Sequence, residues 1–160
     1  MTTNTPNASV RVRWAGDGRF DVGRTQGRAH GTDEGVTVRL DSSGASGPSP
    51  LDAVLSALGA CASVDIVEIL AKRRTPVESL NVEVVGERVD TVPRRLKRAT
   101  LHFSISGEGI ERAQAERAIE LSVTKYCSVR DSLREDIAVD WTLTLDAPVV
   151  STRPTEDTPA

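Results

Sequence analysis

Aromatic residues are scarce in this chain, and their scarcity narrows what the protein can bind. Phe, Trp and Tyr together make up 3% of the sequence. Proteins that bind single-stranded nucleic acid stack the bases on aromatic side chains, so no stacking platform is expected. The basic residues are scattered and the formal net charge is -3, so the charge pattern of a nucleic-acid-binding protein is missing as well. The sequence therefore predicts no nucleic-acid partner.

Cysteine and histidine are also rare, with two of each. His30 and His102 show no metal-ligand spacing with Cys61 and Cys127, so we expect neither a metal nor a cofactor. The first residues, Met1–Ser9, are polar and lack the apolar core of a signal peptide. Few cysteines without such a signal are typical of a cytoplasmic protein whose thiols are reduced or redox-active.

The length of 160 residues favours a single domain that buries a core of its own. We expect this domain to cover residues 9–146. The lead, residues 1–8, and the tail, residues 147–160, are predicted to be disordered, because the lead is polar and the tail is rich in Pro, Thr and acids.

The longest apolar stretch covers residues 47–70, and the rest of the chain is organised around it. Pro48 and Pro50 have φ angles that suit a helix entry, and Ser49 is placed to cap the first turn. The apolar positions that follow steps of three and four are Leu51, Val54, Leu55, Leu58, Ala62, Ile66, Ile69 and Leu70. The pattern predicts a helix from about Pro50 to Arg73.

Small apolar residues cover most of the opposite side of this helix, at Ala53, Ala57, Ala60 and Val64. A helix that is apolar nearly all round is buried in a core, so we expect Cys61 to lie deep in the molecule. The charged residues Asp52, Asp65 and Glu68 interrupt the stretch, which argues against a membrane span. No membrane partner is expected.

Short alternating segments precede the helix and predict a small antiparallel sheet. Val10–Trp14 alternates apolar and polar residues, as a half-buried strand does. Asp17-Gly18 is a hairpin turn signal that leads into a second strand at Arg19–Val22. Further short strands are expected near Gly27–His30 and at Val36–Leu40.

The region after the helix alternates between strand and helix patterns. The segments expected to be strands are Leu80–Arg88, Ala99–Ser106 and Ile137–Leu145. A second helix is expected at Glu111–Val123, with a break near Tyr126–Val129 and a further helical turn at Val129–Leu133. This order of strands and helices is that of an α+β protein.

The residues alone leave two interpretations of the cysteines open. A cysteine in an apolar helix is more often a small hydrophobe than a nucleophile, and Cys61 and Cys127 form no CxxC motif. In favour of chemistry, Cys127 lies within Lys125–Arg130, where cations and a helix terminus can lower the pKa of a thiol.

Two segments resemble the OsmC/Ohr family, the osmotically inducible and organic hydroperoxide resistance proteins. Residues 47–61, GPSPLDAVLSALGAC, are similar to the first-cysteine helix of the family, and residues 118–129, AIELSVTKYCSV, to its second-cysteine helix. The similarity spans Val10–Leu145. It implies an α+β OsmC-like fold: an N-terminal antiparallel sheet, a long buried central helix and a β-β-α-β unit, in an intertwined homodimer.

The resemblance also implies an activity, that of a thiol peroxidase in oxidative stress defence. Cys61 would attack the peroxide as a thiolate and become a sulfenic acid, which Cys127 would resolve to a disulfide. The substrate would be a small hydrophobic organic hydroperoxide, and the reductant a dithiol such as a thioredoxin or a lipoyl protein. No metal, haem or flavin is implied.

Burial raises the pKa of a thiol, so a buried peroxidatic cysteine needs a cation nearby. In the hydroperoxide-resistance branch that cation is an arginine held by a glutamate. Arg19 is the best match for the arginine, although a solvated charge at a strand end fits it equally well. Leu51 stands where the glutamate is expected and Asp52 comes next, as in a less characterised OsmC-like branch that keeps both cysteines.

The distance along the helix limits what Asp52 can do. It lies nine residues before Cys61, about 13 Å along a helix, so it cannot touch that thiol within one helix. In the family the site is completed across the dimer, so the partner chain is a possible source of Asp52 or Arg19. Asp65, one turn beyond Cys61, either faces the thiol and raises its pKa or faces solvent or a capping partner.

An alternative function belongs to another class. The chain would be a non-catalytic OsmC-like protein that binds a small ligand or an acyl chain, or a redox sensor. The missing glutamate favours this alternative a little. It predicts that Cys61→Ala leaves the function largely intact, whereas a peroxidase needs the Cys61 thiolate.

Overall fold

The computed structural model describes residues 10–24 and 37–146. The chain forms two compact units, Met1–Val54 and Leu55–Ala160. The strand expected near Gly27–His30, the lead 1–8 and the tail 147–160 lie outside the described residues. The extent of a single domain, residues 9–146, stays a prediction.

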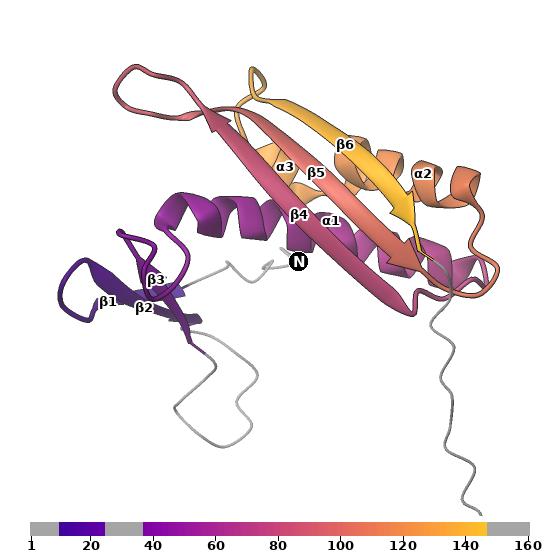
Figure 1. Ribbon diagram of the computed structural model, residues 1–160, viewed down its shortest axis with the longest axis horizontal. Helices are drawn as coiled ribbons and strands as arrows, with labels where there is room; N and C mark the ends of the chain where they lie inside the picture. The colour runs from indigo at the N-terminus through magenta and orange to yellow at the C-terminus, as the bar shows by residue number, and fades with distance from the viewer. Residues whose placement is uncertain (1–9, 25–36, 147–160) are drawn as a thin grey trace, which may run out of the picture. The chain divides into compact units, whose positions relative to one another are not determined.

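The N-terminal unit is built on a three-stranded antiparallel sheet with the order β1-β2-β3 (Figure 1). Its strands are β1 Val10–Trp14, β2 Arg19–Arg24 and β3 Val38–Asp41. The turn between β1 and β2 has positive φ at Gly16, Asp17 and Gly18, a conformation that glycine adopts freely and Asp tolerates. Trp14 pairs with Phe20 across this turn. The predicted antiparallel sheet is confirmed.

A buried carboxylate shapes the loop between β3 and the long helix. Asp41 accepts hydrogen bonds from the hydroxyl and backbone N–H of Ser46, at 2.7 and 2.9 Å, and of Ser43, at 2.7 and 2.8 Å. These bonds hold the pKa of Asp41 far below its usual range. Gly47 follows, where an added Cβ would collide with the Arg39 carbonyl oxygen. The Ser- and Gly-rich loop before the helix is therefore ordered.

The C-terminal unit carries a second three-stranded sheet, with the order β4-β5-β6 (Figure 1). Its strands are β4 Ser79–Arg88, β5 Leu96–Ser106 and β6 Ala138–Leu145. β4 and β5 are antiparallel, whereas β6 lies parallel to β5. A parallel pair needs a crossover connection, and three helical elements supply it. They are α2 Arg112–Leu121, the π-helix η1 Ser122–Tyr126 and α3 Ser128–Ser132. The predicted α+β class is confirmed.

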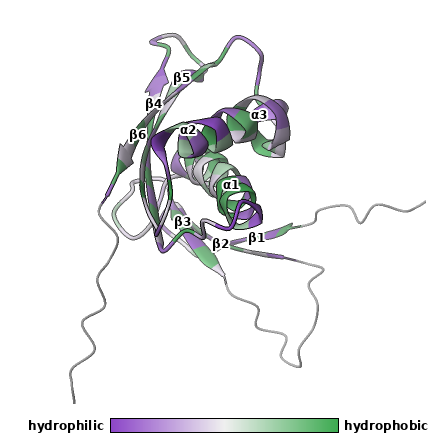
Figure 2. Cartoon of the chain, turned by 90° about the vertical axis from the view of Figure 1, so that its right-hand side faces the viewer, coloured by the Kyte–Doolittle hydropathy of each residue, from purple (hydrophilic) through white to green (hydrophobic). Residues whose placement is uncertain are grey.

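Helix α1, Pro50–Lys72, packs one row of side chains into the core of this unit. The row recurs at every fourth position and is buried: Leu58, Ala62, Ile66 and Leu70. Gly59 allows a close approach to β4, because a Cβ there would lie 2.8 Å from Val84 Cγ2. Figure 2 shows α1 and α2 on the same face of the sheet, and Ala118 and Ile119 of α2 are fully buried there.

The long central helix is confirmed, but its burial differs from the expectation. Its other side carries Val64, which is 58% exposed, and Val67, which is 40% exposed. Cys61 is half-buried rather than deep. The reason is that the sheet and α2 cover one face of the helix within the described chain. When a helix is apolar on all sides, its sequence does not show which side the rest of the same chain covers.

The length and composition of α1 also satisfy the simplest test for a membrane span. Within residues 10–24 and 37–146 it is the one helix that does so. The core helix of a soluble protein passes the same test, and α1 contributes a buried row to the core. The test is therefore weak support for a span.

Candidate active site

Two cysteines that are far apart in the sequence meet in the C-terminal unit. Cys61 lies in the middle of α1, and Cys127 is the N-cap residue of α3. Cys61 Sγ lies 3.8 Å from the Oγ of Ser128, the residue next to Cys127, and the Cys127 side chain is near enough to help lower the pKa of Cys61. Cys127 is buried, whereas Cys61 is partly accessible. The structure thus brings together the two residues that the sequence motifs single out.

A π-helical turn sets the position of Cys127. The helix expected at Glu111–Val123 is α-helical only to Leu121 and continues as η1. The Cys127 N–H donates to the Ser122 carbonyl at 2.9 Å, a bond that spans five residues instead of four. Val123 stays buried through this turn, which is why the apolar pattern overestimates the α-helix. The wider turn ends α2 and leaves Cys127 at the start of α3, where a break was expected.

Ser122 connects this turn to the helix that carries Cys61. Its hydroxyl is buried and has one proton to donate, which two acceptors share: the Ala62 carbonyl at 3.1 Å and Asp65 Oδ2 at 3.0 Å. Its own carbonyl accepts the Cys127 N–H. Ser122 therefore hydrogen-bonds to the backbone of both cysteine segments, at Ala62 beside Cys61 and at Cys127 itself. Asp65 therefore has the Ser122 hydroxyl as a hydrogen-bond partner.

The environment of Cys61 favours its thiolate. Burial raises the pKa of the Cys61 thiol, but hydrogen bonds outweigh this effect and lower its pKa below the ordinary value. The donors are the Val129 N–H, the Cys127 side chain, and the hydroxyl and N–H of Ser128. Two of these N–H groups belong to the first turn of α3, whose own helical partners are missing. The stabilisation expected from a cation is thus supplied in part by backbone donors.

The environment of Cys127 favours its thiol. Burial is the main reason that the pKa of Cys127 rises to about 11, and the adjacent negative charge of Cys61 adds to the rise. The Arg130 N–H donates to Cys127 Sγ at 3.4 Å and acts in the opposite direction. At neutral pH Cys127 therefore keeps its proton, which favours a negative charge on Cys61 rather than on Cys127.

Arg19 lies in the N-terminal unit, at the start of β2. Its guanidinium forms an ion pair with Asp17 at 2.9 Å and donates to the Gly16 carbonyl at 3.3 Å. Both contacts are local to the hairpin turn. They match the interpretation of Arg19 as a charge at a strand end, and its activating role stays a prediction.

Asp52 lies in the first turn of α1 and takes part in a reciprocal cap. Its carboxylate accepts the Ser49 N–H at 2.9 Å, while the Ser49 hydroxyl accepts the Asp52 N–H at 3.2 Å. This capping box satisfies two backbone donors at the helix start. The expected cap at Ser49 is confirmed, and the geometry gives Asp52 a structural task. A catalytic role for Asp52 stays a prediction.

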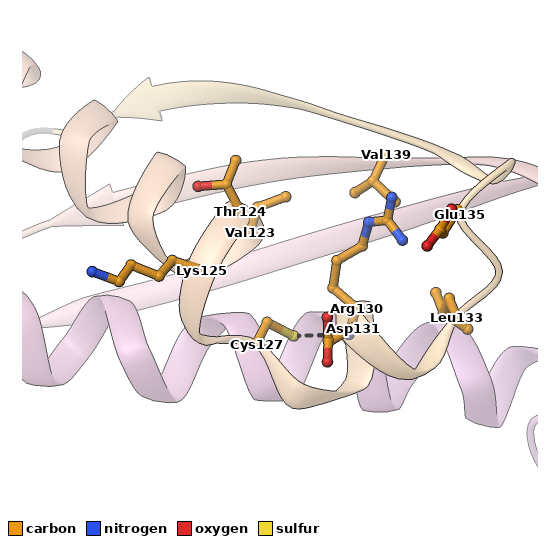
Figure 3. Close-up of a pocket in the computed structure, with 9 residues that line it drawn as sticks. All are labelled: Val123, Thr124, Lys125, Cys127, Arg130, Asp131, Leu133, Glu135 and Val139. Atoms are coloured by element: carbon orange, nitrogen blue, oxygen red, sulfur yellow. Dashed lines mark hydrogen bonds between the residues drawn. The ribbon is translucent and has the colours of Figure 1, made fainter.

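A cavity of about 430 Å³ adjoins the second cysteine (Figure 3). Its walls come from η1, α3, the connection to β6 and β6 itself. The charged residues that line it are Lys125, Arg130, Asp131 and Glu135. Cys127 lines it as well, whereas Cys61 is absent from the lining residues in the described part of the chain. The sequence context of Cys127 had indicated Lys125 and Arg130 as its neighbours, but it did not predict a cavity.

Metal binding receives no support from the described residues. Among residues 10–24 and 37–146, no three His, Cys, Asp or Glu side chains gather as metal ligands would. His102 Nδ1 instead pairs with Thr142 Oγ1 at 2.8 Å, on neighbouring strands. His30 lies outside the described residues.

Sequence reasoning missed Ser122, Ser128 and Val129 as parts of the site. Two of them act through backbone groups, which no side-chain pattern reports. For Ser122 a signal existed, because it is the one polar residue in an apolar run on the buried face of its helix. A buried hydroxyl is expected to have a hydrogen-bond partner.

This chain is similar in sequence to known proteins. The model of a family described as OsmC-like protein matches residues 42–142, which include both cysteines. The Escherichia coli K12 protein YhfA is 38% identical over 131 residues, covering 81% of this chain and 92% of YhfA.

Solved structures show the same fold. The OsmC-like protein from Mycoplasma pneumoniae matches with a TM-score of 0.71 at 18% identity, covering 88% of this chain and 98% of that one. The organic hydroperoxide resistance protein OhrB of Bacillus subtilis matches with a TM-score of 0.58 at 12% identity, covering 87% and 98% of the two chains. The predicted OsmC-like fold is confirmed.

Proposed function

Because the chain belongs to the OsmC family, we propose that it is a thiol-dependent peroxidase that reduces organic hydroperoxides in oxidative stress defence. Membership of the family supports a role in the response to peroxides, since proteins of this fold include OhrB, an organic hydroperoxide resistance protein. In this proposal Cys61 is the peroxidatic residue and Cys127 the resolving one.

The catalytic cycle needs three chemical steps. The Cys61 thiolate attacks the terminal oxygen of the hydroperoxide, the O–O bond breaks, and the released alkoxide takes up a proton to become an alcohol. Cys61 is then a sulfenic acid. The Cys127 thiol attacks that sulfur, a disulfide forms and water leaves. A dithiol such as a thioredoxin or a lipoyl protein returns both residues to thiols and is itself oxidised.

The observation that carries the proposal is the set of donors around the Cys61 sulfur. The N–H groups of Val129 and Ser128 and the side chain of Cys127 all stabilise a negative charge there. A thiolate is the nucleophile in attack on a peroxide, so this environment favours the first step. The same contacts keep the resolving thiol beside the sulfenic acid, which limits further oxidation.

We also infer that the protein works as a cytoplasmic homodimer. Family membership supports the dimer. The exposed Val64 and Val67 on α1 support it too, because a second copy would remove these apolar side chains from water. A dimer also offers a route by which Arg19 or Asp52 of a partner chain contributes to the site.

A second candidate function is that of a non-catalytic protein that binds a small ligand or an acyl chain, or of a redox sensor. The contacts of Arg19 with Asp17 and of Asp52 with Ser49 favour it, because these contacts belong to a hairpin turn and to a helix start rather than to the Cys61 thiol. The two functions differ in what they require of Cys61. A peroxidase needs its charge, and a binding protein needs only its volume.

The deciding experiment measures thiol loss in reduced protein after addition of sub-stoichiometric cumene hydroperoxide, with hydrogen peroxide in parallel. We expect rapid loss of two thiols for each molecule of the organic peroxide added. Cys61→Ser should abolish the loss, and Cys127→Ser should stop the reaction at the sulfenic acid. A reaction no faster than that of free cysteine would overturn the peroxidase and leave the binding protein as the better account.

A further inference from the structure

The cavity beside Cys127 has no task in the peroxidase steps. The hydroperoxide meets Cys61, which is absent from the cavity lining in the described part of the chain, while Cys127 lines it. Cys127 is only 4% exposed and lines the cavity, so the cavity offers an approach to it. In Figure 3 the Cys127 sulfur points toward the Arg130 side of the cavity rather than toward Lys125.

We propose that this cavity admits the thiol that reduces the oxidised protein, and that this thiol attacks the sulfur of Cys127 rather than that of Cys61. The inference rests on the proposed disulfide between the two residues. It assigns oxidant and reductant to different sulfurs, so that each cysteine meets one of the two reagents.

The exchange balances in two steps. The thiolate of the reductant attacks Cys127 Sγ, a new disulfide joins reductant and Cys127, and Cys61 leaves as a thiolate. The second thiol of a dithiol reductant then attacks its own sulfur in that mixed disulfide. Cys127 is released and takes up a proton, and the reductant leaves as a disulfide that has lost two electrons.

The stability of the leaving thiolate also favours attack of the reductant on Cys127 rather than on Cys61. In thiol–disulfide exchange the sulfur that is the more stable thiolate leaves faster. The N–H groups of Ser128 and Val129 stabilise the Cys61 thiolate, whereas Cys127 lies in a site that disfavours its charge. Attack on Cys127 therefore releases the better leaving group.

Arg130 gives the cavity a fixed cation. Its guanidinium donates to the Ile137 carbonyl at 3.2 Å, and its backbone N–H lies 3.4 Å from Cys127 Sγ. A cation held in this way attracts an incoming thiolate. Lys125 adds a second positive charge, while Asp131 and Glu135 place two carboxylates in the same walls. The held position of Arg130 makes it the residue to test.

The test fixes the attacked sulfur by trapping. Oxidation of the protein with diamide forms the disulfide without any peroxide, and brief treatment with 2-mercaptoethanol followed by N-ethylmaleimide traps the mixed disulfide. Trypsin separates the Cys127 peptide, residues 126–130, from that of Cys61. We expect at least about tenfold more adduct on Cys127. Adduct that is mainly or equally on Cys61 overturns the proposal, as does failure of diamide to form the disulfide.

A matched pair of variants tests the cavity itself. Arg130→Met should slow reduction of the diamide-formed disulfide by about fivefold, because the thiolate loses a nearby cation, and Arg130→Lys should restore most of the rate. Arg117→Met, an exposed position on α2 outside the cavity lining, should leave the rate unchanged. Equal rates for Arg130→Met and Arg117→Met contradict entry through this cavity.

These experiments separate the inference from the proposed function. If diamide forms the disulfide but cumene hydroperoxide does not, the peroxidase is wrong, while the trapped adduct still decides which sulfur a thiol attacks. If the hydroperoxide forms the disulfide and the adduct lies on Cys61, the peroxidase stands and the inference fails.

Discussion

Cys61 and Cys127 are the same amino acid in hydrogen-bonding contact, yet their environments displace their pKa values in opposite directions. Burial acts on both thiols and raises the pKa of each. Cys61 accepts hydrogen bonds from two N–H groups, a hydroxyl and its neighbouring thiol, which together reverse the effect of burial. Cys127 must lie beside the charge that forms on Cys61, which adds to the effect of burial.

The difference shows that the pair behaves as one titrating unit. Once Cys61 holds the negative charge, Cys127 keeps its proton more firmly, and that proton in turn stabilises the charge. Identical side chains thus acquire unequal chemistry through their order of ionisation and through the N–H groups around them. The predictions below test this inequality and the contact between the two cysteine segments.

The largest effect is expected in alkylation by iodoacetamide, measured residue by residue as initial rates against pH. The thiolate fraction rises with pH, so the lowered pKa of Cys61 brings its labelling to a plateau at a lower pH than for free cysteine. Cys127, with a pKa of about 11, should be labelled only as the pH approaches that value. At neutral pH we expect a preference for Cys61 of at least about 100-fold.

Unfolded protein is the control for this measurement. In guanidinium chloride the two cysteines have lost their different surroundings and should react at similar rates. Equal alkylation rates of Cys61 and Cys127 in the folded protein as well would contradict the proposed difference between their pKa values.

The fold could be predicted from the sequence to a large degree because its elements follow simple periodic patterns. The alternation in Val10–Trp14 and Ile137–Leu145 and the four-residue spacing of the α1 row each depend on burial of one face, which sequence records directly. The exposure of Val64 could not be predicted in this way. Whether a second apolar face is covered depends on which other surface meets it.

The site was predictable only in part. Cys61 and Cys127 were identified from motifs, and the break before Cys127 from its sequence context. The donors that distinguish the two thiols are mainly backbone N–H groups of α3, and every residue except proline carries such a group. Their use at this place depends on the π-turn geometry of η1, which side-chain patterns do not record.

The next largest effect is expected from removal of the thiol that donates to Cys61. Cys127→Ala takes away one hydrogen bond to the thiolate, so the pKa of Cys61 should rise toward its ordinary value. A hydrogen bond is worth about 1 kcal/mol, so alkylation of Cys61 near neutral pH should slow by about fivefold. Cys127→Ser keeps a donor and should retain most of the rate. If the midpoint of the pH profile of Cys61 alkylation does not move in Cys127→Ala, the backbone donors alone are enough to lower the pKa of Cys61.

A smaller effect is expected when the connection between the two cysteine segments is cut. Ser122→Ala leaves the Ala62 carbonyl and the Asp65 carboxylate without their hydroxyl donor, at a cost of about 1–3 kcal/mol in the free energy of unfolding. Resolution of the Cys61 sulfenic acid should slow more than its formation. Resolution needs a covalent bond between the two segments, whereas formation needs only hydrogen bonds from the second segment to the Cys61 sulfur. Chemical denaturation and stopped-flow oxidation measure the two quantities.

Ser63 provides the matched control for Ser122. Its hydroxyl donates to the Gly59 carbonyl within α1 and spans no gap between segments. Ser63→Ala should therefore change the resolution step little. If both variants slow resolution equally, the effect belongs to α1 and not to the link through Ser122.

The smallest effect is expected at the Ser128 hydroxyl, and it separates side-chain from backbone stabilisation of Cys61. The Oγ–Sγ distance of 3.8 Å makes this a weak contact, while the Ser128 N–H remains in any substitution except proline. Ser128→Ala should raise the pKa of Cys61 slightly and slow its alkylation near neutral pH by about twofold. Ser132→Ala, which removes a hydroxyl that donates to the Ser128 carbonyl, controls for changes in α3 itself. If Ser128→Ala slows alkylation of Cys61 as much as Cys127→Ala does, the hydroxyl, and not the backbone N–H groups in the first turn of α3, is the main cause of the difference between the two cysteines.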